Sequence, residues 1–318
     1  AQRLQAMLAN SPDWCVSRQR IWGVPVPVYY CEKCQTPLAD SQVMNRLADK
    51  MESTGLGLEA YHVHAPEEFT SGKACSACQH TKFTIGRDIL DVWFDSGVCH
   101  TSVQMRNADM GMPADIYLEG SDQHRGWFQT SLVSSMAAYG QSPFKALITH
   151  NFVNDAQGYK MSKSLGNTVD PEDIIKESGA EILRLWASHE DYGQDLTISK
   201  EMISRLSDTY RRFRNTIRFM LGNLSDFEPT KDALSPSELT PVDRWALNEL
   251  HGLVEKCTAA YDAFEFYKVY HALNNFFAHQ LSATYLDILK DRLYTAKANG
   301  AKRRAAQTVI FEILRTLS

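Results

Sequence analysis

Residues 115–128 have the sequence DIYLEGSDQHRGWF, which passes from a strand pattern to a helix pattern through one glycine-containing turn. The apolar run at 115–118 predicts a short buried strand, residues 125–139 predict a helix, and residues 146–150 predict a second strand. Such an order with short connections favours a parallel sheet with crossover helices. The middle of the chain is therefore expected to be an α/β domain.

The turn itself carries groups suited to ligand binding. Glu119, Asp122 and Gln123 offer acceptors for a ribose or an ammonium group, and Gly120 lets the backbone approach a ligand closely. They follow a strand at its carboxyl end, where open parallel sheets bind ligands. The alternative is a plain helix start in which Asp122 is the N-cap.

A second motif, KMSKS, occupies residues 160–164 between two glycines, Gly158 and Gly166. Lys160 and Lys163 can bring two ammonium groups to one anion, because lysine is a compact charge on a flexible stem. Such a loop suits stabilisation of the charge that builds on a triphosphate, while a solvated surface loop is the alternative. The two motifs lie roughly 40 residues apart, the usual length of one strand–helix–strand unit, so we expect them to face each other across one nucleotide cleft.

Bulk composition describes an ordinary globular chain. Of the 318 residues, 44% are hydrophobic and 22% charged, and the net charge is -5, so any nucleic-acid contact must come from local basic patches. No apolar run approaches the roughly 18 residues of a membrane span, and no secretory leader is recognisable, so we expect a cytoplasmic protein. The chain begins at Ala1 without Met and stops at Ser318 within a helical pattern, which suggests a piece of a longer product.

Four of the seven cysteines form two CxxC pairs, Cys31/Cys34 and Cys75/Cys78. Two thiolates from each pair make a tetrahedral S4 set, which suits one structural Zn²⁺ ion. The ion would pin an insertion too small for its own core. A redox CxxC pair and buried free thiols are the alternatives.

The pattern divides the chain into four parts: an entry segment (1–30), a metal-pinned insertion between the CxxC pairs (31–86), a segment of alternating strands and helices with the KMSKS loop (87–198), and a helical bundle (199–318). Periodic apolar residues predict helices at 199–223, 241–262, 265–290 and 301–318. A basic run at Arg211, Arg212, Arg214 and Arg218 is either a solvated face or a contact for nucleic-acid phosphates, and residues 302–304 (KRR) are a weaker candidate.

Several stretches together resemble the isoleucyl-tRNA synthetases, a group of the class I aminoacyl-tRNA synthetases. The most specific is EGSDQHRGWF at 119–128, and the others are KMSKS, WCVSRQRIWG at 14–23, DVWFDSG at 91–97 and DILKDRLY at 287–294. The resemblance covers essentially the whole chain. It implies the second half of a HUP-type Rossmann-like domain with a zinc insertion, followed by an α-helical anticodon-binding bundle. It also implies activation of isoleucine with ATP and Mg²⁺, transfer to tRNA(Ile), and a monomeric enzyme.

The resemblance assigns roles to particular residues. Glu119 would hold the α-amino group of the amino acid, while Gly120, Asp122 and Gln123 would line the adenylate. Lys163, helped by Lys160, would stabilise the phosphates, with Met161, Ser162 and Ser164 completing the ATP-binding loop. Trp93 and Trp127 would wall the pocket for the branched side chain, although core packing is the alternative for a lone Trp. His150 would contact the nucleotide or serve a structural purpose.

The chain departs from the family pattern chiefly by an absence. Class I synthetases need an HxGH tetrad, and none of the ten histidines belongs to one; the inserted editing domain is missing too. The chain alone is therefore expected to be inactive. Asn151 and Ala156 stand where the family often has glycine, which puts the mobility of the KMSKS loop in doubt. Valyl- or leucyl-specific relatives, a nucleotidyltransferase of the wider superfamily, and a non-catalytic zinc and tRNA-binding module are the rival interpretations.

Overall fold

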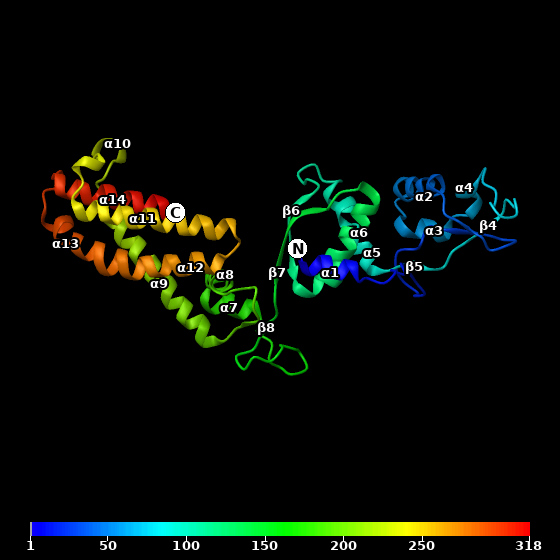
Figure 1. The fold of residues 1–318 in the computed structure, drawn as a ribbon, viewed down its shortest axis with the longest axis horizontal. Coiled ribbons are helices and arrows are strands. Elements are labelled where there is room, and N and C mark those ends of the chain that lie inside the picture. Colours follow the sequence, from blue (N-terminus) through cyan, green and yellow to red (C-terminus); the bar gives the residue numbers. More distant parts are fainter. Residues whose placement is uncertain (1) are drawn as a thin grey trace. The chain divides into compact units, whose positions relative to one another are not determined.

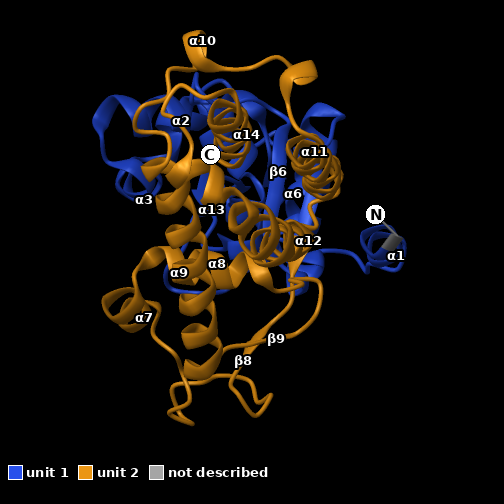
Figure 2. Ribbon diagram, turned by 90° about the vertical axis from the view of Figure 1, so that its left-hand side faces the viewer, with its two compact units in different colours: residues 1–148 blue, residues 149–318 orange. Residues whose placement is uncertain are grey.

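The computed structural model describes residues 2–318 and divides into two compact units, residues 1–148 and 149–318 (Figures 1 and 2). Each unit is described by itself. Among the described residues no helix is both long and apolar enough to cross a membrane.

Residues 29–85 of the first unit form a small subdomain around the two CxxC pairs. Its three-stranded antiparallel sheet has the order β3-β2-β4 and is joined by three helices. The aromatic rings of Tyr29, Tyr61 and Phe69 fill its core, and Asp40 caps α2 by accepting from the N–H groups of Gln42 and Val43. The elements are β2 (Tyr29–Cys31), β3 (Pro37–Leu38), α2 (Ser41–Thr54), α3 (Ala60–Val63), α4 (Pro66–Thr70) and β4 (Phe83–Ile85).

The rest of the first unit contains the strand–helix–strand segment that the sequence predicts. β6 (Ala114–Gly120) and β7 (Phe144–His150) form a two-stranded sheet, and α6 (Trp127–Tyr139) joins them. Helix α6 packs closely on α5, since a Cβ on Gly97 would lie 3.1 Å from Thr130. The remaining elements are α1 (Gln2–Ala9), β1 (Ser17–Arg18), β5 (Ile89–Leu90), which pairs antiparallel with β1, and α5 (Val92–Gly97).

The structure does not support the alternative interpretation of the turn as a plain helix start. Asp122 is not an N-cap; it lies inside a 3-10 turn, Ser121–Arg125, whose cap position is Gly120. Helix α6 begins two residues later than predicted, at Trp127, where the side-chain oxygen of Gln123 accepts a hydrogen bond from the Trp127 N–H at 3.0 Å. The first N–H of α6 is therefore satisfied by Gln123 and not by Asp122.

The second unit opens with the KMSKS loop and a pair of short helices. β8 (Val153–Asn154) and β9 (Leu196–Thr197) pair in parallel on either side of α7 (Pro171–Ser178) and α8 (Ala180–His189). Asp170 caps α7 and Pro171 occupies its first turn, as the sequence predicts. Ile182 and Trp186 of α8 are buried against Ile203 of the next helix, α9 (Lys200–Gly222).

The remaining helices form a bundle around one apolar core (Figure 1). They are α11 (Pro241–Asp262), α12 (Phe266–Asn275), α13 (Leu286–Thr295) and α14 (Ala301–Leu317), and the short helix α10 (Pro229–Asp232) precedes them without a buried residue. The helix predicted at 265–290 is one helical run in which a π-helical stretch, Phe276–Tyr285, separates α12 from α13. Its side chains Phe276, Phe277 and Leu281 are nearly fully buried, so the wider turn brings aromatic rings into the core.

Candidate functional site

The acidic turn after β6 is held by short polar contacts. The Glu119 side chain is exposed and accepts a hydrogen bond from the N–H of Gly120 at 3.0 Å. Gln123 donates to Asp122 at 3.2 Å while its oxygen caps α6. Both carboxylates therefore remain accessible to a ligand, whereas Gln123 already has a structural task.

The predicted pocket tryptophans differ in their surroundings. The ring of Trp127 stacks on Tyr117, with centroids 4.2 Å apart and planes 9° apart, and its N–H donates to the sulfur of Cys99 at 3.3 Å. Trp93 is 43% exposed. Gly126 lies against Trp93, because a Cβ at this position would come within 3.0 Å of the indole ring and 2.6 Å of the Gln123 oxygen. Position 126 therefore requires glycine, because the Trp93 ring and the Gln123 side chain leave no room for a Cβ.

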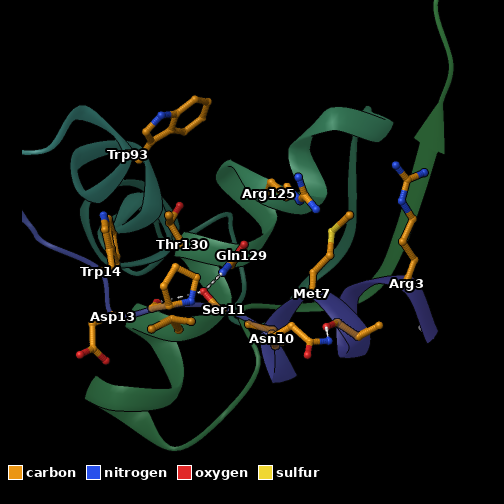
Figure 3. Close-up of a pocket in the computed structure, with 14 residues that line it drawn as sticks. Arg3, Met7, Asn10, Ser11, Asp13, Trp14, Trp93, Arg125, Gln129 and Thr130 are labelled. Carbon is orange, nitrogen blue, oxygen red and sulfur yellow. Dashed lines mark hydrogen bonds between the residues drawn. The ribbon is translucent and has the colours of Figure 1, made fainter.

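A cleft of about 920 Å³ lies in the first unit between α1 and α6 (Figure 3). Trp14 and Trp93 line it on one side, Arg125 comes from the end of the 3-10 turn, and Gln129 and Thr130 come from the start of α6. Glu119, Asp122 and Trp127 are not among its lining residues, so their predicted assembly around a ligand stays a prediction.

Asp91 joins two of the family-like stretches, and sequence reasoning did not single it out. Its buried carboxylate accepts hydrogen bonds from Trp14 at 2.9 Å and Arg18 at 2.6 Å, and it caps α5 through the N–H of Trp93. Burial, together with the neighbouring Asp91 charge, raises the pKa of Asp95. This cluster fixes the backbone that carries Trp93.

The KMSKS loop lies in the second unit and is organised by two residues outside the motif. Asp155 accepts hydrogen bonds from the N–H groups of Gln157 and Tyr159 and from the side-chain amide of Asn167. Asn167 in turn accepts from the N–H of Ser162 at 2.9 Å. The Asn167 hydrogen bond, with those from the backbone, holds the pKa of Asp155 below its usual value. Asp155 with Gly158 is a turn signal that the sequence analysis did not use.

The two lysines of this loop, Lys160 and Lys163, are exposed to solvent, and neither forms an ion pair with a carboxylate in the described part of the chain. The Lys160 ammonium group lies 5.3 Å from the centre of the Phe152 ring. Ser162 and Ser164 place their hydroxyl oxygens 3.1 Å apart, and Met161 packs against the α8–α9 core. The loop therefore offers two cations and two hydroxyls to an anionic ligand.

His150 stands at the end of β7, where one ring nitrogen lies 2.9 Å from the carbonyl oxygen of Asn151. Asn151 donates two hydrogen bonds to the segment before β9, from its N–H to the Tyr192 carbonyl and from its side-chain amide to the Gly193 carbonyl. These hydrogen bonds hold the segment that leads into the KMSKS loop against the residues before β9. The nucleotide contact proposed for His150 stays a prediction.

The four paired cysteines converge. All four sulfurs lie within 4.8 Å of one another, with Cys31 and Cys78 3.6 Å apart and Cys34 and Cys75 3.5 Å apart. A tetrahedral zinc ion with bonds near 2.3 Å needs sulfurs about 3.8 Å apart, so the set fits the ion closely.

The two cysteine pairs have the same local geometry. In each, the residue after the second cysteine, Gln35 or Gln79, adopts a positive φ of 59° and donates its N–H to the first cysteine's carbonyl. The hydroxyl and N–H of Thr36 lower the pKa of Cys34 to about 6, which favours the thiolate that binds metal.

The weaker basic run at residues 302–304 is largely engaged within the bundle. Arg303 forms a two-pronged ion pair with Asp226, and Arg304 is buried and bonds to Asn299, Gln307 and the Asp226 carbonyl. These two arginines fasten the loop before α10 to α14, so neither is free to contact a polyanion.

Comparisons with known proteins agree with this arrangement. The family model for class I tRNA synthetases (I, L, M and V) matches residues 1–199, and the model for the anticodon-binding domain of tRNA ligases matches residues 243–318. The isoleucine–tRNA ligase of Syntrophotalea carbinolica is 50% identical over 98% of this chain, and that of Geobacter sulfurreducens is 48% identical over 99%. The chain spans 34% of each of these relatives, about a third of their length.

Solved structures show the same fold at low identity. A methionyl-tRNA synthetase of Mycobacterium tuberculosis in complex with methionyl-adenylate covers 99% of this chain, with a TM-score of 0.66 and 18% identity; the chain covers 53% of that structure. A LeuRS–tRNA complex of Agrobacterium radiobacter covers 96%, with a TM-score of 0.62 and 19% identity; the chain covers 40% of it. The family model for class I tRNA synthetases matches residues 1–199, which is more than half of this chain. The chain therefore belongs to the class I tRNA synthetases of the isoleucine, leucine, methionine and valine group.

Proposed function

We propose that this chain is part of an isoleucine–tRNA ligase that activates isoleucine with Mg·ATP and transfers it to tRNA(Ile). The observation that carries the proposal is identity of 47–50% to isoleucine–tRNA ligases over nearly the whole chain. We further propose a monomer that works in the cytoplasm, where translation uses its product.

The proposed chemistry needs no nucleophilic side chain. A carboxylate oxygen of isoleucine attacks the α-phosphorus of ATP, the bond to the bridging oxygen breaks, and pyrophosphate leaves with that electron pair. A terminal ribose hydroxyl of the tRNA then attacks the carbonyl carbon of the adenylate, and AMP leaves. Positioning and stabilisation of developing charge suffice for both steps.

The charge-stabilising role falls to the KMSKS loop. Lys160 and Lys163 have no carboxylate partner among the residues that the structure describes, and they stand on a loop closed by Asn167, so their charges are available to the β- and γ-phosphates. Mg²⁺ would share this task when ATP is bound. The serine hydroxyls at 162 and 164 would donate to phosphate oxygens.

The adenylate and amino-acid roles fall to the first unit. Glu119 is exposed at the carboxyl end of β6, where its charge can pair with the α-ammonium group of isoleucine. Gly120, Asp122 and Gln123 follow it along the turn and would line the ribose and base. The half-exposed Trp93 offers a rigid apolar wall for the branched side chain, and Trp127 supports the turn from beneath through its stack on Tyr117.

We also propose one structural zinc ion on Cys31, Cys34, Cys75 and Cys78. With four thiolates and no open position, the ion would take no part in the reaction. It would tie the two CxxC turns together and so hold the β2–β4 subdomain.

A chimera tests the proposal most directly. The corresponding third of the S. carbinolica isoleucine–tRNA ligase is replaced by this chain, and exchange of pyrophosphate into ATP is measured with isoleucine, valine, leucine or methionine. Isoleucine-dependent exchange that is lost in Lys163→Ala is expected, whereas the 318-residue chain alone, without an HxGH tetrad, should show none. Preference for another amino acid would refute the isoleucine assignment, and a folded but inactive chimera would favour a non-catalytic tRNA-binding module.

A further inference from the structure

Trp127, the first residue of α6, is held by contacts to both its ring and its backbone. One face of the indole ring stacks on Tyr117, with the ring planes 9° apart. The indole Nε1–H donates to the Cys99 sulfur at 3.3 Å, and the backbone N–H donates to the side-chain oxygen of Gln123 at 3.0 Å. The orientation of Trp127 is therefore fixed, although the residue is only half-buried.

The sulfur of Cys99 contacts both rings of this stack. It accepts the hydrogen bond from Trp127 and lies 3.8 Å from the hydroxyl oxygen of Tyr117. Cys99 is half-buried and directly precedes the π-helical stretch His100–Gln104, which follows α5. A helical backbone on both sides fixes the place of the thiol. The chemistry proposed above gives this thiol no role.

Tyr117 is a rigid support for the Trp127 ring. It is 2% exposed, and its ring also packs on Phe144, with the ring centroids 4.9 Å apart. Its hydroxyl group lies 3.2 Å from the Ser131 hydroxyl and accepts a hydrogen bond from the Gln104 amide at 3.2 Å. Burial raises the pKa of Tyr117, so the phenol remains neutral. A ring with these partners cannot follow a movement of Trp127.

Trp127 is linked through its neighbour to the proposed wall of the amino-acid pocket. Gly126 lies against the half-exposed ring of Trp93, since a Cβ at position 126 would come within 3.0 Å of that ring. A displacement of Trp127 would carry the Gly126 backbone with it. The position of the Trp93 wall therefore depends on how firmly Trp127 is held.

We propose that Cys99 is a positioning residue for amino-acid selection, because its sulfur fixes the Trp127 ring and, through Gly126, the Trp93 wall. Cys99 itself would not touch the substrate. Isoleucine and valine differ by one methylene group, and a gap of about 0.5–1 Å already forfeits roughly a quarter to a half of a van der Waals contact. A pocket with a loose wall therefore loses the contact that distinguishes them. The inference rests on the proposed function, since it concerns how that same site selects isoleucine.

The test compares Cys99→Ala with Cys99→Ser in the chimera described above. Both side chains are smaller than that of cysteine, but only serine keeps an acceptor for the indole N–H. Pyrophosphate exchange gives kcat/KM for isoleucine and for valine, and their ratio cancels any general loss of activity. In Cys99→Ala this ratio should fall about threefold to tenfold, as expected for the loss of one hydrogen bond. Cys99→Ser should retain the ratio, and so should Cys257→Ala, the matched control at a half-buried cysteine of α11.

NMR spectroscopy of the 318-residue chain tests the cause directly. The chain has six tryptophans, and the indole N–H signal of Trp127 is the one that disappears in Trp127→Phe. Solvent exchange of this N–H should be faster in Cys99→Ala than in the unaltered chain and should remain slow in Cys99→Ser.

The outcomes separate this inference from the proposed function. Equal behaviour of the Ala and Ser variants in either assay would overturn the inference, because loss of packing alone would then explain the effect. An equal fall of the ratio in Cys257→Ala would overturn it as well. An unaltered chimera without isoleucine-dependent exchange would instead refute the proposed function, and the inference with it.

Discussion

Asn167 donates a hydrogen bond from its side-chain amide to the carboxylate of Asp155 at 2.9 Å and so closes the base of the KMSKS loop. The same side chain accepts from the N–H of Ser162. One amide thus connects the turn before the motif with the motif itself. The loop that carries Lys160 and Lys163 is therefore preorganised although it has no strand or helix of its own.

Replacing Asn167 by Ala should reduce amino-acid activation without unfolding the chain. The variant loses a hydrogen bond to a charged acceptor and a hydrogen bond from Ser162, which together stabilise the ordered loop by roughly 2–3 kcal/mol. If all of this is lost in the transition state, kcat should fall by about 30- to 150-fold. Pyrophosphate exchange by the chimera measures the effect, and the KM for isoleucine should stay nearly constant because the proposed contacts to the amino acid come from Glu119 and Trp93 and not from this loop. Gln157→Ala, at an exposed position on the same turn, is the control, and an equal loss there would show that any disturbance of the turn has this effect.

Zinc removal should loosen residues 31–85 and leave the helical bundle unchanged. The chain should contain one zinc ion, and chelation should expose four additional thiols to a thiol reagent. Proteolysis should then begin within 31–85, because the small core around Tyr29 and Phe69 cannot hold the subdomain alone. Cys34→Ser should reproduce the effect, whereas Cys15→Ser, an exposed cysteine outside the cluster, should not. A chain that holds no zinc, or keeps its protease resistance without it, would contradict the assignment.

Elements set by local patterns could be predicted from the sequence. The strand at 115–118, the Asp170-capped helix at 171–178 and the helices after residue 199 follow from apolar period and capping residues, and the structure confirms these elements. The prediction that the strand is buried is wrong, because Tyr117 is buried but Ile116 and Leu118 are exposed. The convergence of the cysteine pairs follows from their spacing, and it is also confirmed.

Features that depend on distant partners could not be predicted in this way. Asp91 and Trp14 are 77 residues apart, and nothing in either local sequence indicates that they bond. Arg304 looks like part of a solvated basic run, yet it is buried by partners from the loop before α10. Helix α6 begins at Trp127 and not at the predicted residue 125, and its first N–H is satisfied by the side chain of Gln123, a residue that is not of the usual capping type. The meeting of Glu119 with Lys163 across one cleft stays a prediction.

The helical bundle should depend strongly on the ion pair between Arg292 and Asp243. Asp243 is fully buried, and Arg292 reaches both of its oxygens at 2.7 and 2.9 Å, while Tyr285 donates at 2.7 Å. Burial alone would raise the pKa of Asp243, but the bonds from Arg292, Thr240 and Tyr285 outweigh it and keep the pKa low. Arg292→Ala leaves an unpaired buried charge and should lower the free energy of unfolding by about 3–5 kcal/mol in urea titrations. Lys290→Ala removes an exposed ion pair with Asp287 and should change the free energy of unfolding by less than about 1 kcal/mol. Similar losses in both variants would show that the buried ion pair stabilises the bundle no more than an exposed one does.

Acid should weaken the attachment of the loop before α10 to helix α14 through Asp226. The ion pair with Arg303 and the bond from Gln307 lower the pKa of Asp226 to about 2, below the value of about 3.9 for an unfolded aspartate. The folded state therefore binds this proton less readily than the unfolded state does. Its contribution to stability is complete above about pH 4 and is lost as the pH falls toward 2.

Asp226→Asn tests this directly, because the amide cannot ionise. The variant should be less stable than the unaltered chain at pH 6, and the difference between the two urea midpoints should shrink as the pH falls to about 2.5. Asp262→Asn, at an exposed position near the end of α11, should follow the unaltered chain throughout. A difference that stays constant over this pH range would mean that Asp226 holds the loop by hydrogen bonding that is independent of its charge.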